Sequence, residues 1–196
     1  MKKVLLALLI ASTVAFSDDD LAFRRGTSTI NAGFNTYFGT YSGNARPGVL
    51  IAFDQGAFDN MFSMGGEFGL YTDRKTLNLG SVQIDSSYTH ISPLFRFGFH
   101  PFGIPPLAGK VKVAKVLDPY VVGGAGFTVT VKKYEYRYMN GTIYNDKENI
   151  GDFAWTVKSG VRWFFNERAN LWGEYWFGSL TEGGSSGITI GAGINF

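Results

Sequence analysis

Apolar and polar residues alternate along most of this chain, so that bulky apolar side chains occupy every second position. Eight segments have this alternation, and stretches rich in turn-forming residues separate them. They lie at 29–39, 47–55, 61–71, 87–99, 119–131, 152–165, 169–179 and 187–196. A period of two is typical of a β-strand with two unlike faces, and strands of about 9–11 residues suit a bilayer crossing. The pattern therefore predicts an all-β protein with eight antiparallel strands.

The two faces of the predicted strands differ in chemistry. In 61–71, for example, Phe62, Phe68 and Leu70 share one face, whereas Glu67 shares the other with small residues. The charged residues in mid-strand all lie on the small-residue faces; they are Glu67, Arg96, Lys158, Arg162 and Glu174. Because a lysine or arginine that faces lipid at the bilayer midplane costs about 2–4 kcal/mol, we expect the bulky faces to touch lipid and the charged faces to line an interior. The prediction is an eight-stranded antiparallel up-and-down transmembrane β-barrel.

A soluble barrel with its apolar faces turned inward is the competing interpretation. Its outer surface would consist mainly of Gly, Ser, Thr and Trp with few charges, which is a poor surface for solubility. Eight inward rows rich in Phe, Trp and Ile would also overfill a small barrel. The membrane barrel is therefore favoured.

The charged residues of the interior are expected to form structural ion pairs. Glu67 is expected to pair with Arg96. A turn centred near Arg168 would place Arg162 directly opposite Glu174. The same register would set Trp176 against Gly160 and Trp163 against Gly173. An eight-stranded barrel is just wide enough for side chains to fill, so no sizeable pore is expected.

The segment 119–131 leaves its inward and outward faces open. We place Val121, Ala125, Phe127 and Val129 outward. A two-residue turn at Asn140-Gly141 would reverse that assignment unless a bulge intervenes, because a shift of one residue moves every side chain to the other face.

Residues 1–17 have the features of a cleaved secretory signal peptide. Lys2 and Lys3 precede an apolar run, and Ala15 and Ser17 occupy the −3 and −1 positions of a cleavage site. The apolar run from Val4 to Phe16 is shorter than the ~20 residues that a spanning helix needs, which disfavours an N-terminal anchor. The expected mature protein, residues 18–196, is one exported barrel domain.

Composition excludes several classes of protein. The chain has no cysteine, so it has neither disulfides nor thiolate metal sites. Without Lys2 and Lys3, the chain has 16 basic and 16 acidic residues, and this balance does not suggest a nucleic-acid-binding protein. Glycine, at 26 of 196 residues, and aromatic residues, at 16%, are both frequent and both poor helix formers, which agrees with an all-β fold.

The last predicted strand carries apolar residues at alternate positions and ends in phenylalanine. These residues are Ile188, Ile190, Ala192, Ile194 and Phe196. Together with the signal peptide and the alternating strands, this ending resembles the small bacterial outer-membrane barrels of the OmpA-like and OmpX/Ail-like type. The resemblance covers nearly the whole predicted mature chain and is one of pattern. It implies a location in the outer membrane, contact with membrane lipids and lipopolysaccharide, and recognition of the last strand by the barrel-assembly machinery.

Residues that could support catalysis are few. His90 and Ser92 share a face that we assign inward, away from a lipid substrate, although outer-membrane lipid A deacylases use His and Ser. No cluster of His, Asp and Glu has the spacing of metal ligands. We therefore expect a non-enzymatic protein without a cofactor. A lipid A-modifying enzyme and a narrow pore for small solutes remain as alternatives.

Function is expected to lie in two outer connections, 73–87 and 132–144. The second alternates tyrosine with charge before Asn140-Gly141, which is a hairpin signal. Both connections are expected to extend beyond the membrane as a protruding sheet. The candidate contact residues are Tyr134, Tyr136, Tyr138 and Tyr144.

Two interpretations of these tyrosines remain open. Tyrosine supplies amphipathic contact area, and an exposed strand edge can pair with another chain, so a host or matrix protein is a possible partner. The alternative is an aromatic girdle in contact with lipopolysaccharide or lipid headgroups. The opposite connection, 100–118, is longer than the usual tight turn, and its sequence offers no reason for that length.

Overall fold

The computed structural model describes residues 27–39, 45–57, 60–104, 112–180 and 184–196. The signal peptide predicted over residues 1–17 lies outside these residues. Among the described residues, no helix is long and apolar enough to cross a bilayer.

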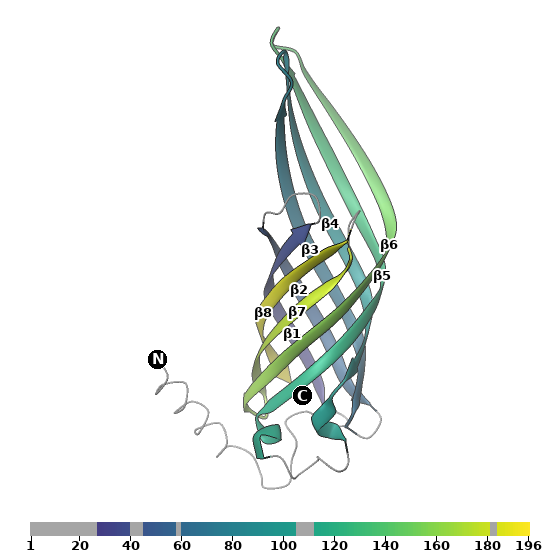
Figure 1. Cartoon of the computed structure of the whole chain (residues 1–196), viewed down its shortest axis with the longest axis vertical. Coiled ribbons are helices and arrows are strands. Elements are labelled where there is room, and N and C mark those ends of the chain that lie inside the picture. Colours follow the sequence, from purple (N-terminus) through teal and green to yellow (C-terminus); the bar gives the residue numbers. More distant parts are fainter. Residues whose placement is uncertain (1–26, 40–44, 58–59, 105–111, 181–183) are drawn as a thin grey trace, which may run out of the picture.

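Eight antiparallel strands form one closed ring (Figure 1). They are β1 (Ser28–Gly39), β2 (Ala45–Ala57), β3 (Phe62–Asn78), β4 (Val82–Phe99), β5 (Leu117–Tyr138), β6 (Ile143–Asn166), β7 (Ala169–Ser179) and β8 (Ser185–Asn195). Each strand pairs with the next in sequence, and β8 pairs with β1. Two short 3₁₀ helices, η1 (Pro101–Gly103) and η2 (Lys112–Lys115), lie between β4 and β5. The predicted up-and-down barrel is confirmed.

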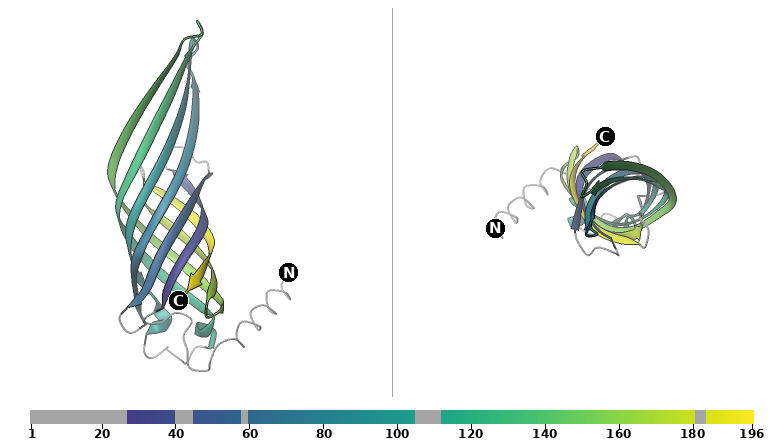
Figure 2. Two further views of the ribbon diagram at one scale, coloured as in Figure 1. Left: turned by 180° about the vertical axis from the view of Figure 1, so that it is seen from behind. Right: turned by 90° about the horizontal axis from the view of Figure 1, so that it is seen from above.

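Four strands continue far beyond the barrel. β3, β4, β5 and β6 have 17, 18, 22 and 24 residues, whereas β7 and β8 have 11 each. Pairing of β2 with β3 ends at Tyr71, and pairing of β6 with β7 begins at Trp155. Residues 72–89 and 131–154 therefore form a protruding sheet, here called the extension, which rises above the ring and narrows to a tip (Figures 1 and 2). The expected protruding hairpins are present, and they are longer than the sequence pattern indicated.

The bulky rows of the barrel face outward. Phe68, Phe95 and Phe127 are exposed on three successive strands, whereas their sequence neighbours Glu67, Arg96 and Thr128 are buried. Exposed apolar rows around a ring with a buried polar interior are the arrangement of a transmembrane barrel. The soluble barrel, which needs the same rows inside, is thereby ruled out.

The outward placement of Val121, Ala125, Phe127 and Val129 on β5 is confirmed. The turn after β5 is not the two-residue turn that would have reversed this assignment. The N–H of Tyr138 donates to the carbonyl of Thr142, which leaves three residues in the turn, with Gly141 at a φ of 85°. An odd number of turn residues preserves the face assignment that a two-residue turn would have reversed.

The register predicted between β6 and β7 is also wrong, by two residues. Glu174 lies opposite Gly160, Arg162 opposite Trp172, Trp176 opposite Lys158 and Trp163 opposite Leu171. One residue of the difference arises because the turn is centred between Glu167 and Arg168, since Asn166 lies opposite Ala169, and the other arises from an irregularity between Phe164 and Asn166. Because the shift is even, every residue keeps its predicted face.

Inward-facing glycines leave room in the lumen for large neighbouring side chains, and a substitution at Gly160 tests this packing. A Cβ at Gly160 would lie 2.7 Å from Cζ of Tyr120 and 2.8 Å from the carbonyl oxygen of Gly173. Gly123 on the outward face of β5 is a matched control, because a Cβ there meets nothing within 4 Å. We expect Gly160→Ala to lower the free energy of unfolding by about 1–3 kcal/mol, measured by urea titration of the folded band on unheated gels. Equal midpoints for Gly160→Ala and Gly123→Ala would contradict this packing.

Candidate functional site

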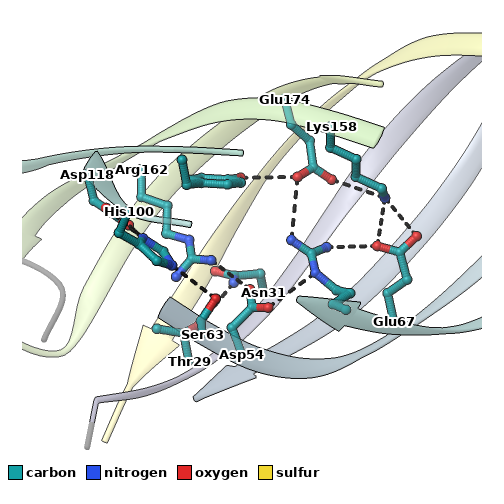
Figure 3. A network of polar contacts seen from close by, with 12 residues as sticks. Thr29, Asn31, Asp54, Ser63, Glu67, His100, Asp118, Lys158, Arg162 and Glu174 are labelled. Atoms are coloured by element: carbon teal, nitrogen blue, oxygen red, sulfur yellow. Dashed lines mark hydrogen bonds and ion pairs between the residues drawn. The ribbon is translucent and has the colours of Figure 1, made fainter. Parts of the chain in front are cut away.

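Six charged side chains meet inside the barrel (Figure 3). Three are acidic and three basic, and all are almost fully buried. They are Asp54 on β2, Glu67 on β3, Arg96 on β4, Lys158 and Arg162 on β6, and Glu174 on β7. The network is therefore neutral in formal charge and joins five strands across the lumen.

Arg96 lies at the centre of this network. Its guanidinium is 2.8 Å from Glu67, 3.2 Å from Asp54 and 3.6 Å from Glu174. Lys158 contacts two of the same acidic groups, with Nζ 2.6 Å from Glu67 and 3.4 Å from Glu174. Buried charges are tolerated only when partners of this kind surround them.

The expected contact of Glu67 with Arg96 is present, but the expected pair of Arg162 with Glu174 is not. Arg162 lies 2.6 Å from Asp54, across the lumen. Glu174 instead accepts a hydrogen bond of 3.1 Å from the hydroxyl of Tyr120, beside its contacts with Lys158 and Arg96. Register between neighbouring strands cannot predict a contact between β2 and β6, and Asp54 was missed for this reason. Its place on the inward face of 47–55 was the available signal.

An aromatic layer lies in the lumen at the end nearer the extension. The rings of Tyr37 and Trp176 stack with centroids 6.3 Å apart, and Tyr71 packs on both. The indole of Trp176 donates to Asn35 at 3.0 Å. Large side chains therefore occupy the lumen between the ionic network and the extension.

His90 and Ser92, the candidate pair for a lipid-modifying enzyme, both lie inside the barrel. His90 contacts Thr130 at 2.9 Å, and Ser92 contacts Thr128 at 2.5 Å. Both residues are buried on the face opposite the lipid-facing row. A lipid acyl chain outside the barrel is therefore separated from them by the sheet.

A second histidine, His100, has the contacts expected of a catalytic triad, but the site is closed to a substrate. His100 Nδ1 is 2.8 Å from Asp118, and its Nε2 is 2.9 Å from the hydroxyl of Ser63 (Figure 3). The order Asp–His–Ser is that of a serine hydrolase triad. However, Ser63 is 0% exposed, so a substrate cannot reach its oxygen. These contacts hold His100, the first residue of the long connection, to β3 and β5.

The described parts of the connection after β4, η1 and η2, lie at the end of the barrel opposite the extension (Figure 1). Ala114 and Val116 are buried, and the carbonyl of Val116 accepts a hydrogen bond of 2.8 Å from the N–H of Phe164 on β6. Together with the contacts of His100, this provides a physical role for the described part of 100–118.

The four tyrosines of the candidate contact set share the face of the extension that continues from the lumen. Tyr136 packs between Tyr134 and Tyr144, with centroids 6.3 and 5.9 Å away. Tyr138 has the same parity on β5 as the lumen-facing Thr130. A girdle requires rings on the lipid-facing side, so these tyrosines do not form one. Partial burial and a hydrogen bond with Tyr88 raise the pKa of Tyr134 to about 12, and its ring is therefore neutral at physiological pH.

The other face of the extension is polar. Asp85 accepts hydrogen bonds from Thr76 at 2.6 Å and from Gln83, and these bonds lower its pKa. Arg137 lies 2.6 Å from Glu135 and 3.7 Å from Asp85. A groove of about 650 Å³ lies in this part of the extension.

Loss of one partner tests the ionic network. Lys158→Met removes a charge from the neutral group and leaves Glu67 and Glu174 to share Arg96. We expect a loss of about 3–5 kcal/mol in the free energy of unfolding, measured by urea titration in vesicles. The double variant Glu67→Gln/Lys158→Met restores neutrality and should recover part of this loss, whereas Ser159→Ala on the outward face should change little. If Lys158→Met matched Ser159→Ala, the network would not support the barrel.

Comparisons with solved structures agree on the fold. Ail of Yersinia pestis, in complex with the heparin analogue sucrose octasulfate, has a TM-score of 0.57 at 15% identity, over 88% of this chain and 99% of that one. OprG of Pseudomonas aeruginosa has a TM-score of 0.56 at 13% sequence identity, and the match covers 90% of this chain and 99% of OprG. The N-terminal barrel domain of Pseudomonas aeruginosa OprF has a TM-score of 0.51 at 16% sequence identity, and the match covers 88% of this chain and 98% of that domain. No protein-family model and no curated protein matches the sequence. The chain therefore has the fold of the small eight-stranded outer-membrane barrels of the OmpA and OmpX/Ail kind.

Proposed function

We propose that this protein is a non-enzymatic barrel of the bacterial outer membrane that presents its extension to partners outside the cell. Long connections of such barrels lie on the extracellular side and short turns on the periplasmic side. The extension and the C-terminus lie at opposite ends of the molecule (Figure 1), which supports an extracellular extension.

A row of apolar side chains across the extension carries this proposal. Leu77 lies opposite Ile84, Ile84 opposite Tyr136, and Tyr136 opposite Tyr144. The row crosses all four strands on the face that continues from the lumen. Leu77 is 45% exposed and Tyr144 58% exposed. Contiguous exposed apolar surface rimmed by polar residues is typical of an interaction site.

The chemistry of the row favours a protein partner. Tyrosine gives a large contact area with few rotatable bonds, and its hydroxyl can hydrogen-bond at the edge of an interface. At the tip, Met139 is 85% exposed and adds a flexible apolar group. A host or matrix protein is the class of partner proposed. The fold of Ail, which was solved with a heparin analogue, supports the idea that a barrel of this shape can bind molecules from outside.

The interior supports a role without transport or catalysis. The ionic network and the aromatic layer occupy the lumen, and His90 and Ser92 are enclosed with them. A narrow solute pore would need a continuous water path past Arg96. A lipid-modifying enzyme would need its catalytic groups on the outer surface.

Substitution of two row tyrosines tests the proposal. Tyr136→Ser/Tyr144→Ser removes both aromatic rings from the row and leaves the barrel unchanged. We expect binding to host cells or immobilised matrix proteins to weaken about tenfold or more, because a few aromatic residues dominate interface energies. The control is Gln83→Ser/Asn145→Ser, which changes the opposite face of the extension on β4 and β6 and should bind normally. Unchanged binding by the tyrosine variant, with the normal shift in gel mobility on boiling, would reject adhesion.

A further inference from the structure

The tip of the extension carries exposed apolar side chains and no charged residue. It consists of two turns, residues 78–82 between β3 and β4 and residues 138–143 between β5 and β6, at the end of the extension away from the barrel (Figures 1 and 2). Neither turn contains Asp, Glu, Lys or Arg. The two turns lie side by side, because the N–H of Met139 donates to the carbonyl of Ser81 at 3.1 Å. The exposed apolar residues, here called the tip group, are Leu79, Tyr138, Met139 and Ile143.

The charge nearest the tip is held toward the barrel. Arg137 lies opposite Ile143 in the pairing of β5 with β6. Its guanidinium is 2.6 Å from Glu135 and 3.7 Å from Asp85. These two acidic residues lie opposite each other, one pair closer to the barrel on the same face. The tip group can therefore leave water without taking the charge of Arg137 with it.

Hydrogen bonds satisfy backbone groups of both turns, which is a condition for entry into lipid. A backbone N–H or carbonyl without a partner strongly opposes transfer out of water. The bonds within and between the turns run from the N–H groups of Leu79, Gly141 and Met139 to the carbonyls of Val82, Tyr138 and Ser81, at 2.8, 3.0 and 3.1 Å. The apolar side chains are thus presented on a backbone that already has partners of its own.

The tip lies well above the hydrocarbon that surrounds the barrel. β6 begins at Ile143, and its pairing with β7 in the ring begins only at Trp155. This separation of about 12 residues corresponds to roughly 30 Å along the membrane normal for strands tilted by ~40°. The outward face between the two levels carries charges, among them Lys133 and Lys147. The hydrocarbon around the barrel therefore does not cover the tip group, which faces water or a second surface.

The size and composition of the tip favour a lipid surface over a protein. A specific protein interface takes about 20–30 residues from each partner, whereas the two turns contain five and six residues. The groove of the extension is lined by residues closer to the barrel and includes neither turn. A bilayer has no such size requirement, because each apolar side chain that enters it contributes separately. Met139, Tyr138 and Arg137 follow one another in the order apolar, tyrosine, charge, which is the order of side chains across a membrane interface.

We propose that the tip group inserts into the bilayer of an apposed cell, as a contact separate from the protein contact of the tyrosine row. The proposal rests on the extracellular placement of the extension proposed above. Met139, Leu79 and Ile143 enter the acyl region, and Tyr138 lies at the level of the headgroups. Because the tip is uncharged, it needs no anionic lipid and suits a bilayer with zwitterionic headgroups. The long sheet thereby spans the space between two membranes.

Binding to vesicles of phosphatidylcholine and cholesterol tests this proposal. The full mature barrel in phosphatidylcholine nanodiscs should sediment with these vesicles, and about 0.5 M salt should not release it, because salt screens only charges. The variant Leu79→Ser/Met139→Ser/Ile143→Ser should bind on the order of 30-fold more weakly. A matched comparison uses two exposed leucines of the same segment: Leu79→Ser should weaken binding about fivefold, and Leu77→Ser, closer to the barrel, less than twofold. Each variant should keep the shift in gel mobility on boiling.

A fluorescent label measures insertion directly. The chain has no cysteine, so Met139→Cys and Asp146→Cys can each carry one environment-sensitive dye. Spin-labelled lipid that is present only in the target vesicles should quench the dye at 139 and leave the dye at 146 unchanged, because residue 146 lies closer to the barrel.

Three results would overturn the proposal. They are equal loss of vesicle binding with Leu77→Ser and Leu79→Ser, release of the native protein by salt, and equal quenching at 139 and 146. Loss of binding to matrix proteins in the triple variant, without binding of the native chain to vesicles, would assign the tip to a protein contact instead. The vesicle assay contains no protein partner, and labelling of Met139→Cys on intact cells with an impermeant maleimide tests the extracellular placement by itself. Failure of this proposal is therefore distinguishable from failure of the proposed function.

Discussion

The pairing of backbone hydrogen bonds in hydrocarbon is the constraint on which this structure depends. A strand edge in lipid leaves N–H and C=O groups without partners, so a sheet can cross a bilayer only as a closed ring. The contact of β8 with β1 closes that ring. Closure with eight strands fixes a narrow interior, which must be filled by side chains. Three groups of side chains fill this interior: the neutral network around Arg96, the aromatic layer at Trp176, and His100 with its partners Asp118 and Ser63.

The extension shows what happens where that constraint ends. Beyond Tyr71 and Trp155 the strands leave the ring, and β3 and β6 each have an edge without a partner strand in the described residues. The chemistry of the two faces changes at the same level. The outward face, apolar at Phe127, becomes basic at Lys133, whereas the face that continues from the lumen becomes aromatic at Tyr134 and Tyr136. The proposed protein contact of the aromatic face follows from this change.

Much of the barrel could be predicted from the sequence because lipid imposes a simple rule on it. Alternation gives the strands and both faces, and the inward placement of Glu67, Arg96 and Lys158 follows from the cost of a charge in lipid. The extension was underestimated because its outward face is polar, so that the contrast between faces weakens past Val131. The contact of Arg162 with Asp54 crosses the lumen, and the irregularity after Phe164 depends on local backbone geometry. Neither leaves a periodic signal in the sequence.

The central claim is that the odd-numbered face of β5 touches lipid up to Val131 and water beyond it, while the even-numbered face lines an enclosed lumen. The chain has no cysteine, so single cysteines can carry spin labels without background. Labels at 121, 127, 128 and 133 of the barrel in vesicles should be compared for collision with dissolved oxygen and with a water-soluble nickel chelate. The account predicts collision with oxygen at 121 and 127, little of either at 128, and collision with the chelate at 133. Chelate access at 121 and 127, or oxygen access at 128 equal to that at 127, would contradict it.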